Sequence, residues 1–495
     1  MSVVNASTPD LVKYPNRLFI GGKWQPPEDG SSIDVINPSN GRVLVSVAEA
    51  KEADINHAVA SAREAFDHGP WPRMTHLERA QYLREIGRAI VSRSSHLSDI
   101  WSSEVGVIRA FAGVITPTNA QTYEYYADLA ATFPFEERHQ PQIGHTGLLV
   151  REPVGVVAAI IPWNGPLGLI ANKLAPALLS GCTVVLKMSP EAPASGYVMA
   201  EICEAVGLPP GVVNVITADR EASEVLVRHA GVDKVAFTGS TAVGKRIAAI
   251  CADRVARVTL ELGGKSAAVI LDDCDLEQAA ESISQSARLL TGQVCSSLTR
   301  LIVTKRQHDR FVDALSASMN RIRVGDPFDP ESHMGPLAME RQRDRVEHYI
   351  AKGREEGAKL TAGGHRPKHL SQGYFIEPTV FANVDNRMTI AREEIFGPVL
   401  SVLPAKSEED AIEIANNSIY GLNASVFTKD AGRAYEVARR LRSGTVGHNG
   451  FRSDFSIAFG GFKQSGIGRE GGTEGLRPYL EIKTIILDAD PSPTH

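Results

Sequence analysis

The sequence predicts an α/β protein built from two doubly wound open sheets. Short apolar runs without polar alternation recur along the chain, which is typical of strands buried on both faces of a parallel sheet. Helical segments with apolar residues at three- and four-residue spacing lie between these runs, so strand and helix alternate as in βαβ units. The alternation restarts after Gly264, and 495 residues suffice for two or three domains.

The amino-terminal part of the chain precedes this alternation. Residues 17–30 predict a short strand and turn, 50–129 predict helices, and 133–145 predict a loop or an edge hairpin. The first series of buried strands is expected at 154–161, 183–186, 212–216 and 232–237, with a weaker one at 259–262. The helices between them are expected at 167–179, 194–206, 222–229 and 243–251.

The second series predicts another α/β domain. Its strands are expected at 267–271, 301–304, 379–381 and 398–403. Its helices are expected at 307–322, 340–353, 407–415 and 431–441. The tail, 479–487, alternates partly and predicts a strand that pairs with another domain or subunit.

The composition is ordinary for a globular protein, with 43% hydrophobic and 22% charged residues. A formal net charge of −6, with acids and bases interspersed, disfavours a nucleic-acid partner. The five cysteines form no CxxC pair, so neither a disulfide framework nor a zinc site is indicated, and a reducing, cytoplasmic location is favoured. No signal peptide and no apolar run of about 20 residues is visible, so we expect no membrane span.

Two features at predicted strand ends point to a nucleotide. The string Gly239-Ser-Thr-Ala-Val-Gly244-Lys245 opens a helix, whose free N–H groups attract phosphate. It fits a Walker A loop except that Arg246 stands where Ser or Thr would hold Mg²⁺, and a plain tight turn is an equal interpretation. Lys187 ends its strand, where ligands of open sheets gather, although a solvated lysine is the simpler interpretation.

Three residues supply a thiol, an amide donor and a carboxylate, the parts of nucleophilic carbonyl chemistry. Polar neighbours of Cys295 predict a turn at a helix start, where the macrodipole stabilises a thiolate; an inert buried thiol is the alternative. Asn164 is either an Asx turn or helix cap or an oxyanion donor. Glu261, at an apolar strand end, is either paired with a cation or has a raised pKa suited to a base.

Six motifs occur in order along the chain: PWNGP from Pro162, GSTAVG from Gly239, ELGGK from Glu261, GQVCS from Gly292, EEIFGPV from Glu393 and FGGFKQSGIGRE from Phe459. Together they resemble the aldehyde dehydrogenase superfamily, of the NAD(P)-dependent hydrolytic type, from near Phe19 to Lys483. The resemblance implies an oxidoreductase that converts an aldehyde into a carboxylic acid. A nucleotide hydrolase is disfavoured by Arg246, and an inactive homologue would need a lost Cys, Glu or Asn, none of which is lost.

By this resemblance Cys295 is the nucleophile, and Asn164 with the Cys295 backbone N–H forms the oxyanion hole. Thiolate attack gives a thiohemiacetal, hydride transfer leaves a thioester, and Glu261 activates the water that hydrolyses it. Lys173 and Glu470 match positions that relay protons. Coenzyme A, the alternative acceptor, would not need the base, so Glu261 favours hydrolysis.

The implied cofactor is NAD, with NADP as the alternative. Lys187 matches an adenine-ribose ligand and Glu394 a nicotinamide-ribose ligand, although a solvated acid is the simpler interpretation of Glu394. Pro190 replaces the family's common acid that repels a 2′-phosphate, with Glu191 next to it, which leaves the choice of cofactor open. The other implied cofactor residues are Ile161, Pro162, Trp163, Ser189, Gly239, Ser240, Gly244, Leu262, Gly263 and Phe396.

The implied substrate residues are Gly165, Leu169, Asn172, Val294, Ser296, Phe451, Arg452 and Phe459. The first three occupy positions that are often bulky in family members acting on small aldehydes. Less bulk predicts a larger or polar aldehyde, with Arg452 and Asn172 available to its distal polar group; a surface salt bridge is the alternative for Arg452. Leu290 replaces a usual Asn upstream of the nucleophile.

The resemblance also divides the chain. Residues 1–129 and 153–262 form the dinucleotide-binding domain, 263–463 the catalytic domain, and 130–152 with 479–495 a small β oligomerisation arm. We expect a homodimer or homotetramer acting on a small-molecule aldehyde, without a metal.

Overall fold

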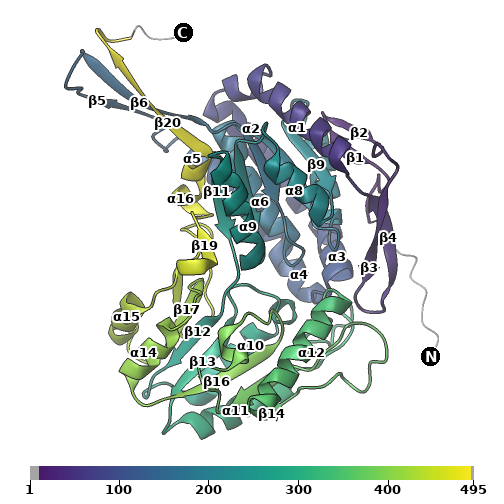
Figure 1. The fold of residues 1–495 in the computed structure, drawn as a ribbon, viewed down its shortest axis with the longest axis vertical. Helices are drawn as coiled ribbons and strands as arrows, with labels where there is room; N and C mark the ends of the chain where they lie inside the picture. Colours follow the sequence, from purple (N-terminus) through teal and green to yellow (C-terminus); the bar gives the residue numbers. More distant parts are fainter. Residues whose placement is uncertain (1–10, 492–495) are drawn as a thin grey trace.

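Figure 1 shows two α/β bodies, one above the other, with a thin arm projecting from the upper one; this computed structural model describes residues 11–491. Residues 1–10 of the predicted dinucleotide-binding domain and 492–495 of the predicted arm lie outside the described residues. Each body contains an open, mainly parallel sheet, so the predicted fold class is confirmed.

The upper body is built on eight strands. In spatial order they are β19 (Gly466–Ile467), β11 (Arg257–Glu261), β10 (Lys234–Thr238), β7 (Val156–Ile160), β8 (Thr183–Met188), β9 (Val213–Thr217), β1 (Leu18–Ile20) and β2 (Lys23–Gln25). The strands from β11 to β9 run parallel, whereas β19, β1 and β2 are antiparallel to their neighbours. The strand order reverses between β7 and β10, and ligands of open sheets bind in the crevice at such a reversal.

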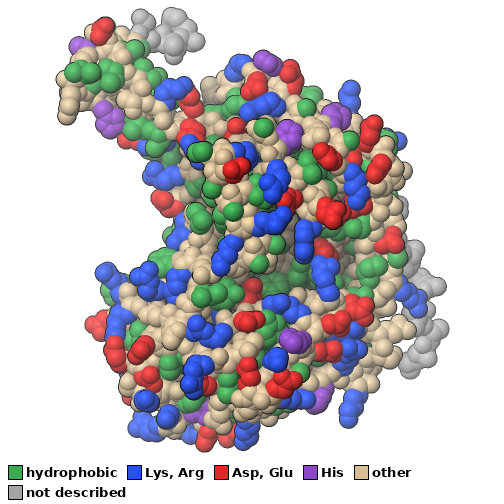
Figure 2. Space-filling view, in the orientation of Figure 1, with side chains coloured by type: hydrophobic (Ala, Val, Ile, Leu, Met, Phe, Trp, Pro, Cys, Tyr) green, Lys and Arg blue, Asp and Glu red, His purple; other side chains and the backbone are tan. Residues whose placement is uncertain are grey.

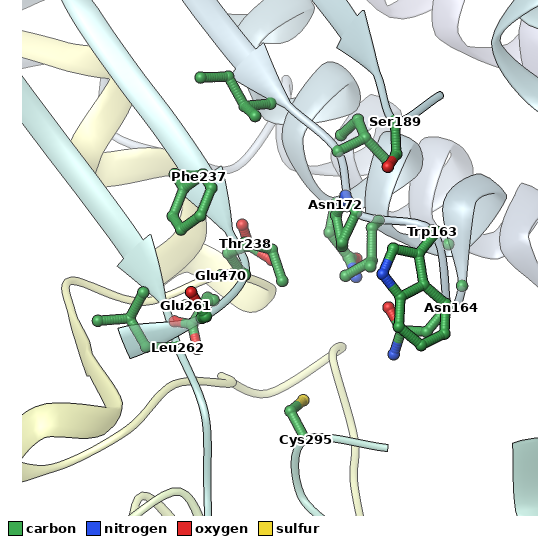
Figure 3. Close-up of a pocket in the computed structure, with 18 of the residues that line it drawn as sticks. Trp163, Asn164, Asn172, Ser189, Phe237, Thr238, Glu261, Leu262, Cys295 and Glu470 are labelled. Carbon is green, nitrogen blue, oxygen red and sulfur yellow. The ribbon is translucent and has the colours of Figure 1, made fainter. Parts of the chain in front are cut away.

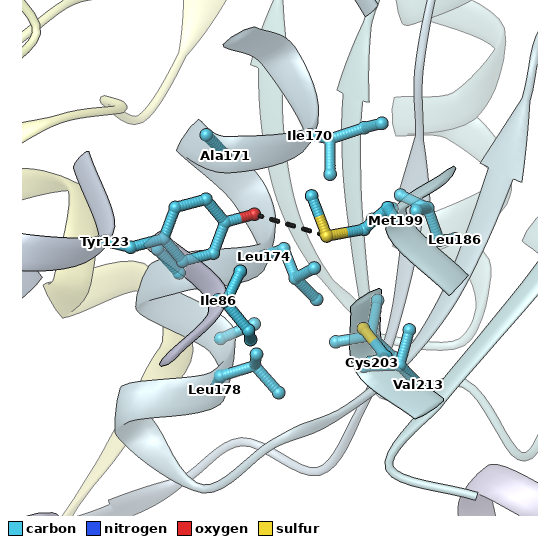
Figure 4. Packing of buried hydrophobic residues seen from close by; sticks show 14 of the residues in the cluster. Ile86, Tyr123, Ile170, Ala171, Leu174, Leu178, Leu186, Met199, Cys203 and Val213 are labelled. Carbon is cyan, nitrogen blue, oxygen red and sulfur yellow. Dashed lines mark hydrogen bonds between the residues drawn. The ribbon is translucent and has the colours of Figure 1, made fainter. Parts of the chain in front are cut away.

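Helices cover both faces of this sheet, as the alternate apolar side chains of its strands require. One face carries α1 (Glu52–Asp67), α8 (Arg220–Arg228) and α9 (Thr241–Asp253). The other carries α2 (His76–Ser92), α3 (Ser94–Val105), α5 (Ala120–Leu129), α6 (Pro166–Ser180) and α7 (Ala194–Ala205). Figure 4 shows this second face, where Tyr123 and Leu174 pack around Met199 and the tyrosine hydroxyl donates to the methionine sulfur at 3.9 Å.

The lower body contains seven strands, six of them parallel. In spatial order they are β14 (Lys359–Ala362), β15 (Thr379–Ala382), β16 (Val399–Ala405), β13 (Leu298–Thr304), β12 (Ser266–Ile270), β17 (Asn423–Phe427) and β18 (Thr445–His448). One face carries α10 (Leu276–Ala287) and α11 (His308–Asn320), and the other α12 (Glu340–Glu355), α14 (Glu408–Asn416) and α15 (Ala431–Arg440).

The arm is an antiparallel sheet of β20 (Leu480–Leu487), β6 (Thr146–Pro153) and β5 (Glu136–His139), in that order. A separate hairpin joins β3 (Ser32–Asn37) to β4 (Arg42–Ala48). The remaining helices are short: α4 (Arg109–Ile115), α13 (Thr389–Arg392) and α16 (Gly472–Leu476), with 3₁₀ turns at Trp71–Arg73, Thr116–Asn119, Leu289–Gly292, Lys463–Ser465 and Arg477–Tyr479. None of the helices in the described part of the chain is long and apolar enough to cross a bilayer.

The predicted strands and helices are all present, with ends displaced by no more than three residues. The hairpin β3–β4, the helix α10 and the strands β14, β17, β18 and β19 were not predicted. Helix α10 buries Leu276, Ala279, Ala280, Ile283 and Ala287 at regular helical spacing, so its apolar period was present in the sequence and was missed. Strand β19 shows that the chain returns from the lower body to the edge of the upper sheet.

Candidate active site

A cavity of about 2250 Å³ lies between the two bodies, at the carboxyl ends of the parallel strands of the upper sheet. Figure 2 shows the surface hollowed at this level. Typical small-molecule pockets have volumes of about 300–1,000 Å³, so this cavity is larger than one small ligand requires.

Most of the predicted site residues line this cavity. They are Cys295, Glu261, Asn164, Glu470, Ile161, Pro162, Trp163, Lys187, Ser189, Gly239, Ser240, Leu262, Gly263, Glu394, Phe396, Gly165, Leu169, Asn172, Val294, Ser296, Phe451 and Phe459. Three predicted residues do not line it: Lys173 is buried behind it, Gly244 packs beneath it, and Arg452 lines a neighbouring cavity. A Cβ at Gly244 would collide with Leu262, so glycine lets α9 approach β11 closely.

The Cys295 sulfur points into the cavity, with Glu261 on one side and Asn164 on the other (Figure 3). The expected helix start is wrong: Cys295 lies in a turn between the 3₁₀ turn Leu289–Gly292 and β13, where no helix dipole assists ionisation. Burial raises the pKa of the Cys295 thiol to about 12, and the carboxyl groups of Glu394 and Glu261 raise it as well. In this state the sulfur is therefore a thiol rather than a thiolate.

The turn that carries Cys295 has an unusual backbone. Leu290, Thr291 and Gly292 all have positive φ, of 48°, 55° and 71°. Two left-handed residues that are not glycine are costly, and such strain persists where the surroundings fix it. The Thr291 hydroxyl donates to the Gly335 carbonyl at 3.0 Å, and the buried Gln293 amide donates to Leu290 O at 2.8 Å. These bonds hold the turn in place.

Asn164 is tied to the same turn from the other body. Its Nδ2 donates to the Gln293 carbonyl at 3.0 Å, and the Trp101 indole N–H donates to the Asn164 carbonyl at 2.9 Å. The cap of α6 is Gly165, with no side-chain hydrogen bond, so Asn164 does not serve as the helix cap. The amide is thereby held beside the nucleophile.

Glu261 ends β11 and belongs to a buried charged cluster. Its side chain is 2% exposed, and neither carboxylate oxygen has a hydrogen-bond partner within residues 11–491. Burial, with the Glu470 carboxylate nearby, raises the pKa of Glu261 well above its usual range. Behind it, buried Lys173 forms an ion pair with Glu470 and donates to the Thr238 hydroxyl at 2.5 Å. A carboxyl group of raised pKa is a strong base once ionised.

At the far end of the cavity, Lys187 places a buried ammonium group at the wall. Its side chain is 7% exposed at the end of β8, and burial lowers its pKa to about 8 although Glu191 and Asp219 oppose the shift. Glu191 accepts a hydrogen bond from the Ser189 hydroxyl and pairs with Arg341 of α12. The Glu191–Arg341 pair therefore joins the upper body to the lower one.

Helix α9 begins at the same end. The Ser240 side chain caps it by accepting from Val243 N–H at 3.4 Å, and Gly239 precedes the cap at the cavity wall. A helix start of this kind attracts phosphate through its free N–H groups.

Glu394 and Phe396 approach from the lower body. Gly264 N–H donates to a Glu394 carboxylate oxygen at 3.0 Å, and burial raises the pKa of Glu394 to about 7 against this hydrogen bond. A Cβ at Gly263 would displace the Glu394 carboxylate, so glycine leaves room for that carboxylate in its present position. Across the cleft, the Phe396 and Trp163 rings pack in a T-shaped arrangement, with their centroids 5.4 Å apart.

Part of the cavity wall carries no motif and was not predicted. Helices α4 and α5 contribute Phe111, Gln121 and Tyr125, and the loop before Phe459 contributes Asp454 and Phe455. These residues are far apart in sequence and of ordinary types, so only the fold brings them together. Within the described part of the chain, no cluster of His, Cys, Asp or Glu side chains is placed to hold a metal ion.

Comparisons with known proteins agree with this arrangement. The model of the aldehyde dehydrogenase family matches residues 24–485. The geranial dehydrogenase of Castellaniella defragrans is 43% identical over 471 residues, which cover 95% of this chain and 98% of that protein. The 3-succinoylsemialdehyde-pyridine dehydrogenase of a Pseudomonas species is 41% identical over 473 residues, covering 95% of this chain and 98% of that protein.

Two solved structures are similar over almost their entire lengths. An aldehyde dehydrogenase of Mycobacterium tuberculosis complexed with NAD⁺ has a TM-score of 0.94 and 42% identity, covering 96% of this chain and 99% of that chain. A mutant aldehyde dehydrogenase of Pseudomonas syringae complexed with NAD⁺ and octanal has a TM-score of 0.93 and 38% identity, covering 97% and 99%.

The raised pKa of Cys295 leads to a test on the protein without ligands. At pH 8.5, where a free cysteine is about half ionised, iodoacetamide should modify Cys295 at least about a hundredfold more slowly than free cysteine. Glu394→Gln should speed the reaction about tenfold, because losing a nearby negative charge lowers a thiol pKa by about one unit. Peptide mass spectrometry measures the rate at Cys295, with Glu393→Gln as the control; equal rates in all three proteins would contradict this electrostatic account.

Proposed function

The chain belongs to the aldehyde dehydrogenase family, and we propose that it works through covalent chemistry at Cys295. It is an oxidoreductase that converts an aldehyde into the carboxylic acid with NAD(P)⁺. One observation carries the proposal: the Cys295 thiol, the Asn164 amide and the Glu261 carboxyl group face one cavity from three different elements (Figure 3). Oxidation through a thioester needs a nucleophile, an oxyanion donor and a base.

The upper crevice fits a dinucleotide. Buried Lys187 presents an ammonium at a strand end, and the start of α9 at Gly239 and Ser240 suits a pyrophosphate. Glu394 and Phe396 lie on the opposite wall, beside the nucleophile, where a nicotinamide riboside would be held. When bound, NAD⁺ supplies the acceptor for the hydride. The remaining residues assigned to the cofactor are Ile161, Pro162, Trp163, Ser189, Gly244, Leu262 and Gly263.

Two donors stabilise the first intermediate. Ionised Glu261 takes the proton of the Cys295 thiol as the sulfur bonds to the aldehyde carbon, and the carbonyl oxygen becomes an oxyanion. The Asn164 amide has a second N–H besides the one bound to Gln293 O, and the Cys295 backbone N–H is the other donor. Each such donor lowers the barrier by about 3 kcal/mol.

Glu261 acts on the thioester that remains after the hydride has left. It removes a proton from water, whose oxygen bonds to the carbonyl carbon, and the Cys295 thiolate leaves as the carboxylic acid forms. Lys173 and Glu470, which form an ion pair behind Glu261, carry the proton away. The raised pKa of Glu261 supports hydrolysis over transfer to coenzyme A, which would need no such base.

The substrate end of the cavity supports a larger or polar aldehyde. Gly165 has open space within 4 Å of where a Cβ would stand, and Leu169 and Asn172 add little bulk beside it. Phe451 and Phe459 form the facing wall, and Val294 and Ser296 flank the nucleophile. Long aldehydes named for two relatives, geranial and octanal, are consistent with such a pocket.

The arm supports a homodimer or homotetramer. Strand β20 is an edge of its sheet, and Ile482 and Ile486 are 66% and 49% exposed. An apolar strand edge is a template for pairing with a second chain. We assign residues 1–129 and 153–262 to cofactor binding, 263–463 to catalysis and 130–152 with 479–495 to assembly; the separate sheets of the described residues support this division. Five free thiols support a reducing, cytoplasmic location.

Removal of the nucleophile tests the proposal directly. Cys295→Ala should lower aldehyde-dependent formation of reduced cofactor at least about a thousandfold, while the protein still binds NADH. Absorbance of the reduced cofactor and fluorescence titration measure the two properties. Cys274→Ala, at the other partly exposed cysteine, is the control and should keep its rate. Turnover retained by Cys295→Ala would refute the assignment.

Removal of the base should separate the two half-reactions. Glu261→Gln should give a burst of reduced cofactor close to one equivalent per site, followed by slow turnover, because the thioester is no longer hydrolysed. Rapid-mixing absorbance and mass spectrometry of the acylated Cys295 peptide check this, with exposed Glu277→Gln as the control. Normal steady-state turnover in Glu261→Gln would rule out this role.

We further propose that Glu191 replaces the acid missing at Pro190 and favours NAD over NADP. It lies at the same end of the cavity as Lys187. Burial acts to raise the pKa of Glu191, but hydrogen bonds from Ser189 and Arg341 lower that pKa below its usual value, so the carboxylate stays ionised. A fixed negative charge there repels a 2′-phosphate.

Fluorescence titrations with NADH and NADPH test this without turnover. The wild type should bind NADH more tightly, and Glu191→Gln should narrow the difference about tenfold, because the repulsion is lost and Arg341 is freed for the phosphate. Glu340→Gln, an exposed neighbour of Arg341, is the control. An unchanged ratio of affinities in Glu191→Gln would exclude this role for Glu191.

A further inference from the structure

A second cavity, of about 560 Å³, adjoins the substrate end of the cleft. It lies between residues 106–111, which lead into α4, the helix α10, and the loop that follows β18. Four residues line both cavities: Phe111, Leu289, Leu290 and Phe451. The partition between the two cavities is therefore apolar.

Positive charge is concentrated in this second cavity. Arg288 and Arg452 line it, and no aspartate or glutamate does so. Neither guanidinium group forms an ion pair or a hydrogen bond with another of the residues from 11 to 491. The surface salt bridge that was the alternative for Arg452 is thus not formed there. Two unpaired guanidinium groups in an acid-free cavity favour an anion.

The local fold places Arg452 toward this cavity. Its carbonyl accepts a hydrogen bond from Asn423 Nδ2 at 2.9 Å, which fixes the backbone. Its side chain passes over two glycines: a Cβ at Gly447 would lie 2.9 Å from Arg452 Cγ, and one at Gly450 would lie 3.9 Å from Arg452 Nε. Glycine at 447 therefore leaves space for the aliphatic stem of Arg452, and the guanidinium group lies in ordinary contact range of Gly450.

The other polar side chains of α10 in this cavity already have acceptors. The Ser282 hydroxyl donates to Asn449 O at 3.4 Å, the Ser286 hydroxyl to Ile283 O at 2.9 Å, and the Gln285 amide to a Glu281 carboxylate oxygen at 3.1 Å. The two guanidinium groups are therefore the donors that an anion would use. A carboxylate accepts several hydrogen bonds at once and pairs with guanidinium groups through two parallel N–H···O bonds. The apolar partition suits a hydrocarbon chain that leads from the cleft into this cavity.

We propose that the second cavity binds the anionic far end of the substrate, so that the enzyme prefers aldehydes that carry a carboxylate at the other end of an alkyl chain. The aldehyde group lies at Cys295, the chain passes Phe111, Leu290 and Phe451, and the carboxylate meets Arg452 and Arg288. This assignment rests on the proposed function, because it defines the substrate class of the same active site.

Matched pairs of substrates test the proposal. The pairs are alkanals and ω-oxocarboxylates of equal length with four, six and eight carbons, such as octanal and 8-oxooctanoate. In the wild type, kcat/KM for at least one oxocarboxylate should exceed that of its alkanal about tenfold, and the preference should shrink as salt is added. Arg452→Gln and Arg288→Gln should each raise KM for that oxocarboxylate about tenfold and leave the alkanal within about twofold.

Arg306→Gln is the matched control, since it removes the same charge at an exposed site that lines neither cavity. Arg452→Glu should reverse the preference, so that an ω-aminoaldehyde becomes the better substrate. Binding gives a second measurement: octanedioate should raise the melting temperature of the wild type and not that of Arg452→Glu.

The outcomes distinguish a failure of this inference from a failure of the proposed function. Equal kcat/KM for alkanals and oxocarboxylates at every length, or a preference that survives Arg452→Glu, would overturn this inference and leave the dehydrogenase assignment intact. Failure to oxidise any aldehyde in the panel would overturn the proposed function itself. A preference for acetaldehyde over all longer aldehydes would refute both the larger-substrate proposal and the role of the second cavity.

Discussion

The position of the nucleophile depends on close contact between main chains, which side chains would prevent. A Cβ at Gly264 would collide with the Cys295 carbonyl, and a Cβ at Gly292 would collide with the backbone of Gly397. The Cys295 turn is therefore confined between the segment that follows β11 and the segment that precedes β16. Because Glu261 ends β11, the same short segment sets the positions of both the base and the nucleophile.

The electrostatics of the site follow from burial. Cys295, Glu261 and Glu394 all have raised pKa values, and burial is the largest cause in each case. Glu261 escapes a direct cation partner because Lys173 is paired with Glu470 instead. A carboxyl group next to an ion pair, rather than within one, keeps the high proton affinity that general-base catalysis requires. The cluster is thus arranged to hold protons near the reacting carbon.

The sequence predicted those parts of the protein that depend on a local pattern of residues. Buried parallel strands appear as uninterrupted apolar runs, and two residues at their ends, Lys187 and Glu261, were singled out by position as candidates and both line the cavity. The environment of Cys295 was predicted wrongly, because glycine and serine neighbours are equally compatible with a helix start and with a left-handed turn. Arg452 was placed on the substrate wall, whereas only the packing of its loop over Gly447 and Gly450 shows that it lines the adjoining cavity. The cavity wall formed by α4 and α5 has no local sequence pattern, because its contacts join residues that are far apart in the sequence and depend on the tertiary structure.

The return of the chain to the upper sheet through β19 has a geometric consequence. Covalent connections between the bodies run beside Glu261: the Gly263–Gly264 segment leaves there, and β19 pairs with the end of β11 on its way back. At the opposite side the bodies are joined by breakable contacts, among them the Glu191–Arg341 pair and the hydrogen bond from Arg109 N–H to Pro327 O at 2.9 Å. Rotation of one body against the other would therefore have its axis near the base. The mouth where a dinucleotide enters would widen most, while the distance between Glu261 and the Cys295 turn would change least.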